Sequence, residues 1–202
     1  MTLGGTIRQY PNDFIVEEVW GDRVYTIHYS LVHRIKDLTY MKLHKKKEYT
    51  HFTLIKKEWE TIRALNRLRR SLRVSLNRFG IAGMKDKRAI TAQRVSVWNI
   101  NVQTLMNLKV KDITLKDFRY ADERINLGNA IVNRFTIVIR KIPGTKNTIK
   151  QVLHRFQCQV ATEGIPNMFG SQRLCSGLND SAETTQPSVK LLKMATSSKL
   201  LC

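Results

Sequence analysis

One stretch of the chain constrains the fold more than any other, because its apolar residues repeat at a single spacing. Between Glu58 and Phe79 an apolar residue recurs every three or four positions: Trp59, Ile62, Leu65, Leu68, Leu72, Leu76 and Phe79. This spacing places them all on one face of an α-helix. Gly80 follows the last of them, where a left-handed C-terminal cap suits glycine. The pattern predicts a helix over 58–79 that ends at Gly80.

The rest of this predicted helix surface is basic. Five arginines lie off the apolar stripe with hardly any acidic partner, so ion pairs within the helix do not account for them: Arg63, Arg67, Arg70, Arg73 and Arg78. A second basic stretch, KLHKKKEYTH over 42–51, shows no period, as expected of a loop. Phosphate contact and simple solvation explain that loop equally well. For the helix we favour an RNA-facing surface.

The charge of the whole chain favours the same kind of partner. Its 202 residues include 35 Lys and Arg against 16 Asp and Glu, which gives a net charge of +19. Residues 36–94 hold seventeen of the basic and five of the acidic residues. Such an excess favours polyanions, because each cation that neutralises a phosphate releases condensed counterions. We expect nucleic acid first and an anionic membrane surface second.

Other segments predict a mixture of strands and helices. Residues 7–19, 88–100 and 134–142 alternate between two faces, which is typical of strands, and the second is a candidate partner of the third. Residues 147–163 place apolar residues at helical spacing, with Asn147 or Thr148 as the N-terminal cap and Gly164 as the terminator. This order of elements predicts an α+β fold.

Several classes of protein are excluded by what the sequence lacks. No apolar run approaches the ~18–20 residues of a transmembrane helix, and the N-terminus has no apolar core of a signal peptide. Motifs of phosphate-loop nucleotide hydrolases, α/β-hydrolases and zincins do not occur. The five histidines and three cysteines show no ligand spacing, so we predict no metal. We expect a cytoplasmic protein and, of the two partners that its charge allows, nucleic acid rather than a membrane.

Asp86 is the residue best placed to do chemistry. It is a lone carboxylate among Lys85, Lys87 and Arg88, and it follows glycines at 80 and 83 that would allow a tight turn. Nearby cations favour the ionised form of a carboxylate. An ionised carboxylate would repel phosphates if this surface only bound RNA, so the pattern suggests a nucleophile or a base. A salt-bridged turn aspartate is the structural alternative, which the pattern alone favours.

Four collinear segments bear on this choice. Residues 79–93, FGIAGMKDKRAITAQ, resemble the signature of the TruD family of tRNA pseudouridine synthases, whose catalytic aspartate lies in a G-x-K-D core. Residues 8–18, RQYPNDFIVEE, resemble the family's N-terminal motif, and residues 127–140, LGNAIVNRFTIVIR, its G-N-x-F motif. Residues 164–173, GIPNMFGSQR, resemble its P-N-Y-F-G-x-Q-R motif. Together they identify the chain as a member of this family, and the motifs resemble those of archaeal members.

The resemblance implies both a fold and a set of roles. The fold is a pseudouridine synthase-like mixed, mainly antiparallel sheet flanked by helices, and no metal or organic cofactor takes part. Asp86 is the implied nucleophile, Phe14 helps to shape the active site, Asn133 orients the aspartate or the base, and Phe135 stacks on the target uracil. Arg8 stands where the family usually has a lysine, and its cation could pair with the aspartate. On pattern alone, both phenylalanines would be core residues of strands.

The resemblance stops near residue 173. Val132 replaces the glycine of the third motif, Met168 replaces the tyrosine of the fourth, and Leu174 and Cys175 stand where Phe-Gly is expected. Residues 174–202 are rich in Ser and Thr and have no sustained period, so we predict a poorly ordered tail. We expect 1–173 to be the N-terminal part of a catalytic domain, incomplete through truncation or a frameshift.

The motifs and the charge together predict an enzyme that acts on RNA. We expect it to isomerise uridine, at the family's usual target uridine 13, to pseudouridine in tRNA. Lys85 joins the predicted substrate-binding residues, and the residues predicted to bind RNA are Arg63, Arg67, Arg70, Lys87 and Arg88. Two alternatives stay open. One is a catalytically incomplete RNA-binding fragment, and the other is a structural RNA-associated protein in which Asp86 is only a turn residue.

Overall fold

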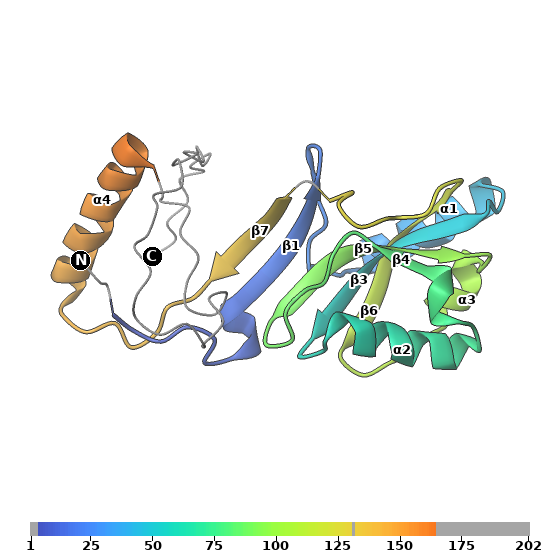
Figure 1. Cartoon of the computed structure of the whole chain (residues 1–202), viewed down its shortest axis with the longest axis horizontal. Helices are drawn as coiled ribbons and strands as arrows, with labels where there is room; N and C mark the ends of the chain where they lie inside the picture. Colours follow the sequence, from blue (N-terminus) through green and yellow to red (C-terminus); the bar gives the residue numbers. More distant parts are fainter. Residues whose placement is uncertain (1–3, 131, 165–202) are drawn as a thin grey trace, which may run out of the picture. The chain divides into compact units, whose positions relative to one another are not determined.

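A computed structural model describes residues 4–130 and 132–164 of the chain. They belong to two compact parts: one comprises Gly4–Lys141, and the described residues of the other are 142–164. Figure 1 labels most of the elements, which in chain order are η1 (Pro11–Asp13), β1 (Phe14–Trp20), β2 (Arg23–Val24), α1 (Leu31–Leu43), β3 (Tyr49–Lys57), α2 (Thr61–Leu72), η2 (Leu76–Arg78), β4 (Phe79–Ile81), β5 (Ile90–Trp98), α3 (Val102–Met106), β6 (Ile113–Ala121), β7 (Val132–Ile137) and α4 (Lys146–Glu163).

The sheet of the first part is organised around β5. Antiparallel β3 follows one edge of β5 along its whole length and pairs on its other side with β6. The opposite edge of β5 is shared, because β1 pairs with Ile90–Ala92 in parallel and β4 pairs with Val95–Val97. β1 also pairs with β2 and β7, both antiparallel. The predicted α+β fold with a mixed, mainly antiparallel sheet is therefore confirmed.

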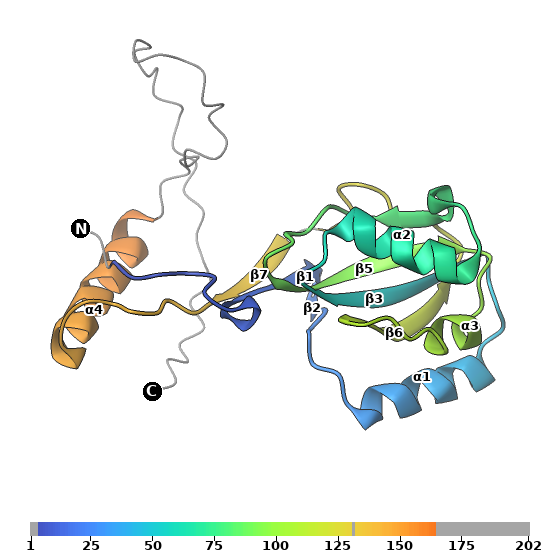
Figure 2. The ribbon, with the colours of Figure 1, turned by 90° about the horizontal axis from the view of Figure 1, so that it is seen from below.

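The two faces of this sheet are covered differently. One face, which we call the α2 face, packs Phe52, Leu54, Val95 and Phe118 against Leu65 and Leu68 of α2 and Val102 and Leu105 of α3, and this is the main core. Helix α1 lies on the opposite side, as Figures 1 and 2 show, and packs mainly against β6. Burial of an apolar side chain contributes about 1.5–3 kcal/mol, so the α2 face supplies most of the apolar stabilisation.

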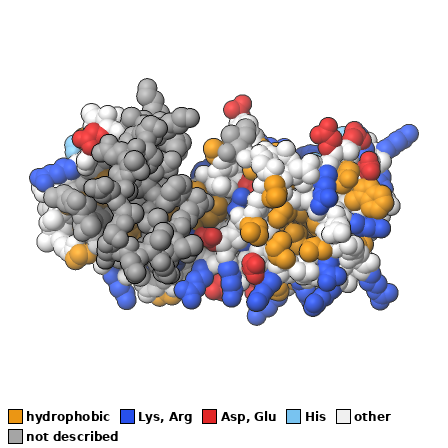
Figure 3. Space-filling model, in the orientation of Figure 1, with side chains coloured by type: hydrophobic (Ala, Val, Ile, Leu, Met, Phe, Trp, Pro, Cys, Tyr) orange, Lys and Arg blue, Asp and Glu red, His pale blue; other side chains and the backbone are white. Residues whose placement is uncertain are grey.

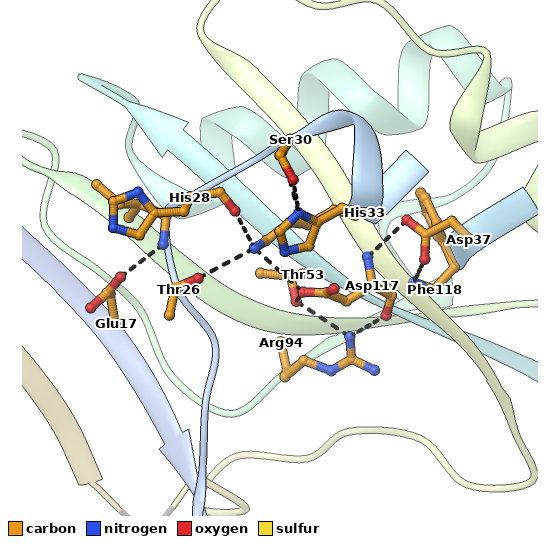
Figure 4. A network of polar contacts seen from close by, with 12 residues as sticks. Glu17, Thr26, His28, Ser30, His33, Asp37, Thr53, Arg94, Asp117 and Phe118 are labelled. Carbon is orange, nitrogen blue, oxygen red and sulfur yellow. Dashed lines mark hydrogen bonds and ion pairs between the residues drawn. The ribbon is translucent and has the colours of Figure 1, made fainter. Parts of the chain in front are cut away.

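The opposite side, which we call the α1 face, is held by polar contacts, drawn in Figure 4. Asp37 of α1 is buried and accepts hydrogen bonds from the backbone N–H groups of Asp117 (3.1 Å) and Phe118 (3.0 Å). Lys116 Nζ donates to the carbonyl of His28 at 2.6 Å, and Arg94 donates to the carbonyl of Asp117 at 2.8 Å. Buried polar groups of this kind must be satisfied, and here they attach α1 and its preceding segment to β6.

The predicted helix over 58–79 is correct at its start and wrong at its end. Helix α2 ends at Leu72, and Arg73 adopts a left-handed conformation with φ 54° whose N–H donates to the carbonyls of Arg69 and Arg70. The chain then turns through η2 into β4. Leu72, Leu76 and Phe79 all pack on the core, so their spacing resembled a helical stripe although the last two return to that core through a turn and a strand.

Gly80 is required for a reason other than helix capping. It lies in β4, and a Cβ atom there would come within 2.3 Å of the carbonyl oxygen of Ile125 and 2.5 Å of Ser96 Oγ. No side chain fits in that space, so glycine permits a close approach between β4 and the segment after β6. The expected cap at Gly80 was wrong.

The remaining predicted elements are present with corrected bounds and partners. The strand expected over 7–19 is β1, preceded by η1, and the strand expected over 88–100 is β5. The strand expected over 134–142 is β7, which pairs with β1 rather than with β5. Much of the expected 42–51 loop belongs instead to the end of α1 and the start of β3. In the second part, α4 ends at Gly164 as predicted, but its cap is Thr145 rather than Asn147 or Thr148.

Candidate active site

The loop that carries Asp86 emerges where two strands part. β1 leaves the edge of β5 after Ala92, and β4 occupies the same edge from Val95 onward. The loop of residues 82–89 connects β4 to β5 at this division. The carboxylate of Glu18, from β1, fills the space between them and accepts a hydrogen bond from the N–H of Arg94 at 2.8 Å. The loop is therefore anchored on both sides by the sheet.

Asp86 is held at the surface by Arg8. Its side chain is 55% exposed, and its Oδ2 accepts a hydrogen bond from Arg8 Nη2 at 2.6 Å. The guanidinium of Arg8 lies 3.8 Å from the ring centroid of Phe14, a cation–π distance. The backbone φ of Arg8 is 57°, which is unusual for a residue other than glycine. The expected pairing of Arg8 with Asp86 is present, and buried Phe14 supports the cation from below.

Lys85 points away from the exposed surface. Its Nζ lies 2.7 Å from Glu18 Oε1, with both side chains almost fully buried. The other oxygen of Glu18 also accepts from Trp20 Nε1 at 3.2 Å. A lysine committed to such a pair anchors its own loop, so the structure places Lys85, one of the predicted substrate-binding residues, beneath that loop.

Three further side chains hold the loop from beneath, and sequence reasoning missed all three. Lys56 of β3 donates to the backbone carbonyls of Lys85 and Asp86, at 3.3 and 2.9 Å. Thr61, the first residue of α2, accepts from the N–H of Lys85 at 3.0 Å and donates to Gln93 Oε1 at 3.1 Å. Gln93 in turn donates to the carbonyl of Gly83 at 3.2 Å. The only feature of the sequence that could have indicated this support is Lys56, a lysine within an otherwise buried strand.

The predicted residues of β7 lie on the same face of the sheet. Phe135 pairs in register with Val16, and Asn133 pairs with Glu18, so both share the face of Phe14 and of the Asp86 loop. The rings of Phe14 and Phe135 meet edge to face, with centroids 6.0 Å apart. Phe14 is 6% exposed and Phe135 is 55% exposed. Phe14 is therefore a core residue, whereas Phe135 presents its ring to solvent.

The predicted RNA-binding residues of α2 form one exposed stripe. Arg63, Arg67 and Arg70 lie opposite the buried face of the helix, with Arg63 3.4 Å from Glu60. Figure 3, in the orientation of Figure 1, shows Lys and Arg side chains along the margin where α2 lies. Two lysines of the predicted basic loop contact other side chains of the protein. Lys46 donates to Asn99 and Lys47 pairs with Asp122, each at 2.6 Å.

Lys87 and Arg88 are exposed beside Asp86. Arg88 lines a hollow of about 250 Å³ together with Arg8, Tyr10 and Glu58. Two guanidinium groups in one hollow next to an exposed carboxylate suit a phosphate or a sugar edge of a nucleotide. Within the described ranges, no group of His, Cys, Asp and Glu could hold a metal ion, and no helix could cross a membrane.

Comparisons with known proteins identify the family of the chain. A model of the family described as tRNA pseudouridine synthase D (TruD) matches residues 1–178. The chain belongs to the TruD family. A protein named "Probable tRNA pseudouridine synthase D" from Methanosarcina barkeri is 33% identical over 176 residues, which cover 86% of this chain and 36% of that protein. A "Probable tRNA pseudouridine synthase D 1" from Methanocaldococcus jannaschii is 35% identical over 170 residues, covering 84% and 41%.

A solved structure gives the same relation in three dimensions. The crystal structure of a TruD protein from Methanosarcina mazei superposes with a TM-score of 0.72 at 29% identity, covering 87% of this chain and 36% of that one. The chain thus spans between 36% and 41% of the length of these TruD relatives. Of the four TruD motifs, the one at 164–173 lies outside the described residues except for Gly164, and the predicted tail over 174–202 lies outside them entirely.

Proposed function

We propose that this chain carries the catalytic aspartate of a tRNA pseudouridine synthase, with Asp86 as the nucleophile and uridine 13 of tRNA as the target. One observation carries the proposal: Asp86 is a half-exposed carboxylate on a loop anchored by buried contacts, paired with Arg8 and set in a basic surface. Membership of the TruD family supports this role, because the residues around Asp86 resemble the family's G-x-K-D core. With tRNA as the substrate, the proposal places the chain in the cytoplasm.

The reaction conserves atoms. Asp86 attacks the ribose at C1′, or promotes elimination, so that the bond from C1′ to N1 of uracil breaks. The free base rotates and carbon 5 bonds to C1′, which breaks the ester bond to Asp86 or, in the elimination route, is accompanied by return of the proton removed from C2′. Carbon 5 then loses its proton and N1 gains one. Arg8 donates a charge-assisted hydrogen bond to Asp86 Oδ2 and so orients the carboxylate for the first step. No residue is consumed, so the carboxylate is free again at the end.

The base needs a surface to hold it outside the RNA stack. The exposed ring of Phe135, on the same face as the Asp86 loop, suits stacking on uracil. Asn133 has amide groups that could orient the base or the aspartate, and Phe14 supports Arg8 through its ring. The exposed arginines of α2, with Lys87 and Arg88, would neutralise backbone phosphates.

Tritium release tests the proposal. The substrate is tRNA labelled at carbon 5 of uracil, and the variants are Asp86→Asn and, as a matched control, Asp122→Asn, whose aspartate is also exposed and paired with a cation. We expect release from the wild-type chain and from the control but not from Asp86→Asn. A labelled tRNA with cytidine at position 13 should release nothing, and full release from it would reject uridine 13 as the target.

The two alternatives give different results in the same assay. An RNA-binding fragment without a complete active site would bind tRNA and release no tritium from any variant. A structural RNA-associated protein would likewise release none, and Asp86→Asn would leave its tRNA binding unchanged. Measuring binding and release together therefore separates the enzyme from both.

A further inference from the structure

Lys56 is a buried cation beneath the Asp86 loop. Its side chain is fully buried, on the α2 face of β3, and its Nζ donates to three backbone carbonyls: Trp59 at 2.6 Å, Asp86 at 2.9 Å and Lys85 at 3.3 Å. Among the described residues it forms no ion pair. Burying an ammonium is costly, and this one is compensated mainly by main-chain oxygens. Its position therefore calls for a reason beyond packing.

The number of donors matches the number of acceptors. An ammonium has three N–H groups, and the three carbonyls take one each, whereas a neutral amine has only two. Two of the carbonyls belong to the loop, at Lys85 and Asp86, and the third belongs to Trp59, which precedes the N-cap residue of α2. A single charged group thus ties the Asp86 backbone to both β3 and the start of α2.

We propose that Lys56, in its ammonium form, is a positioning residue that fixes the loop backbone so that the Asp86 carboxylate faces the substrate. This deepens the proposed function and rests on the role of Asp86 given there. Lys56 does not touch substrate. It acts through the two carbonyls that fix where the Asp86 side chain begins, and through the attraction between its charge and the carboxylate.

The surroundings of Lys56 make this device sensitive to pH. Burial is the largest cause and lowers the pKa of Lys56 to about 8. The charged groups that face it are Asp86 and Glu60, which oppose that change, and Lys85, which adds to it. Lys56 is thus an ammonium at pH 7 and loses its third donor as the pH rises through about 8. We expect the loop to loosen over that range.

Hydrogen exchange tests the positioning directly and needs no catalysis. The variant Lys56→Met keeps the length of the side chain and removes its charge, and Lys57→Met, at the exposed next position of β3, is the matched control. We expect amides in 82–89 to exchange at least ~10-fold faster in Lys56→Met and at the wild-type rate in Lys57→Met. Wild-type exchange of the loop in Lys56→Met would overturn the proposal.

The wild-type chain provides a second form of this test should Lys56→Met not fold. Protection of 82–89, corrected for the intrinsic rate, should fall between pH 7 and pH 9 relative to protection of the β3 amides, because only the loop depends on the ammonium. Parallel behaviour of loop and strand across that range would count against the proposal.

Kinetics separate positioning from stability. In the tritium assay, Lys56→Met should lower kcat by ~10–100-fold at pH 7 while KM and the Kd for tRNA stay within ~2-fold. The wild-type kcat should fall above pH 8, and this fall should be absent from Lys56→Met. An unchanged kcat in a folded Lys56→Met would reject the proposal. If instead Asp86→Asn proves as active as wild type, the proposed function fails, while loop exchange still decides whether Lys56 positions the loop.

Discussion

The two faces of the sheet each hold a carboxylate on a network of buried groups, and the two are used differently. On the α1 face, Asp37 is buried and accepts two backbone N–H groups of β6. On the α2 face, Asp86 is 55% exposed and is bound by the guanidinium of Arg8. A carboxylate saturated by fixed backbone donors stabilises a fold. A carboxylate held by one side chain and open to solvent can meet a substrate.

The buried cations of the two faces show the same division. Lys116 donates to the carbonyl of His28 and lies 3.6 Å from Asp117 Oδ2, so it connects the segment before α1 to β6. Lys56 donates to carbonyls of the loop that carries Asp86. Both side chains are buried, but only the second acts on a residue exposed to solvent. The α2 face thus supports an exposed group, and the α1 face supports the sheet.

Loss of the Asp86 carboxylate should have the largest effect on activity. We expect Asp86→Asn to lower tritium release by at least ~10³-fold, because a neutral amide is a poor nucleophile. Its free energy of unfolding should stay within ~0.5 kcal/mol of wild type, since the side chain is half exposed. Release is measured by tritium assay and stability by urea unfolding. A large loss of stability would mean that Asp86 is structural, as Asp37 is.

Loss of the Asp37 carboxylate should give the opposite result. Asp37→Ala leaves two buried N–H groups of β6 without an acceptor, at a cost of about 1–3 kcal/mol each, so we expect a loss of about 3 kcal/mol in the free energy of unfolding. Activity per folded molecule should be unchanged. Urea unfolding measures the loss, and Asp122→Ala, which removes an exposed pair with Lys47, should cost less than ~1 kcal/mol. Equal losses in the two variants would contradict the contrast between the faces.

The α2 arginines should affect RNA binding and neither stability nor chemistry. Replacing Arg63, Arg67 and Arg70 together by alanine should weaken tRNA binding and flatten its dependence on salt, by about 0.7–0.9 in logarithmic slope for each phosphate that is no longer neutralised. The control is Lys109→Ala, at an exposed position beside α3. Binding is measured by filter retention between about 50 and 200 mM salt, where counterion release changes the affinity strongly. An unchanged slope would mean that these three arginines do not contact RNA phosphates.

Much of the α2 face could be predicted from the sequence because its signals are local. The start of α2 follows from a periodic stripe, and β1 and β5 follow from alternation. The pairing of Arg8 with Asp86 joins residues 78 positions apart and was expected only through the TruD motifs. The roles of Lys56 and Glu18 were missed, since their partners lie 29, 30 and 76 positions away and no local pattern encodes them.

The α1 face was largely missed for a related reason. In α1, Asp37 is the buried residue, while Leu31, Val32 and Ile35 are exposed, so the helix has no apolar stripe to recognise. β3 is buried on both faces, and the register between β3 and β6 shifts between His51 and Thr53, which breaks the alternation expected of a half-buried strand. Polar burial depends on partners distant in sequence, so periodicity alone does not predict it.

The smallest expected effect is the dependence of stability on pH at Asp37 of the α1 face. Burial, as the largest cause, raises the pKa of Asp37 above its ordinary value of 3.8, with the charge of Asp117 acting in the same direction against the two N–H donors. The folded chain therefore retains the proton to a higher pH than the unfolded chain. This contribution to stability is fully present below pH 3.8 and is lost as the pH rises through the folded pKa. Asp37→Asn cannot titrate at this position. The free energy of unfolding of the wild type, relative to that of Asp37→Asn, should therefore fall as the pH rises over that interval and be constant above it. A step of the opposite sign for Asp37 would mean that its hydrogen bonds from β6 outweigh its burial.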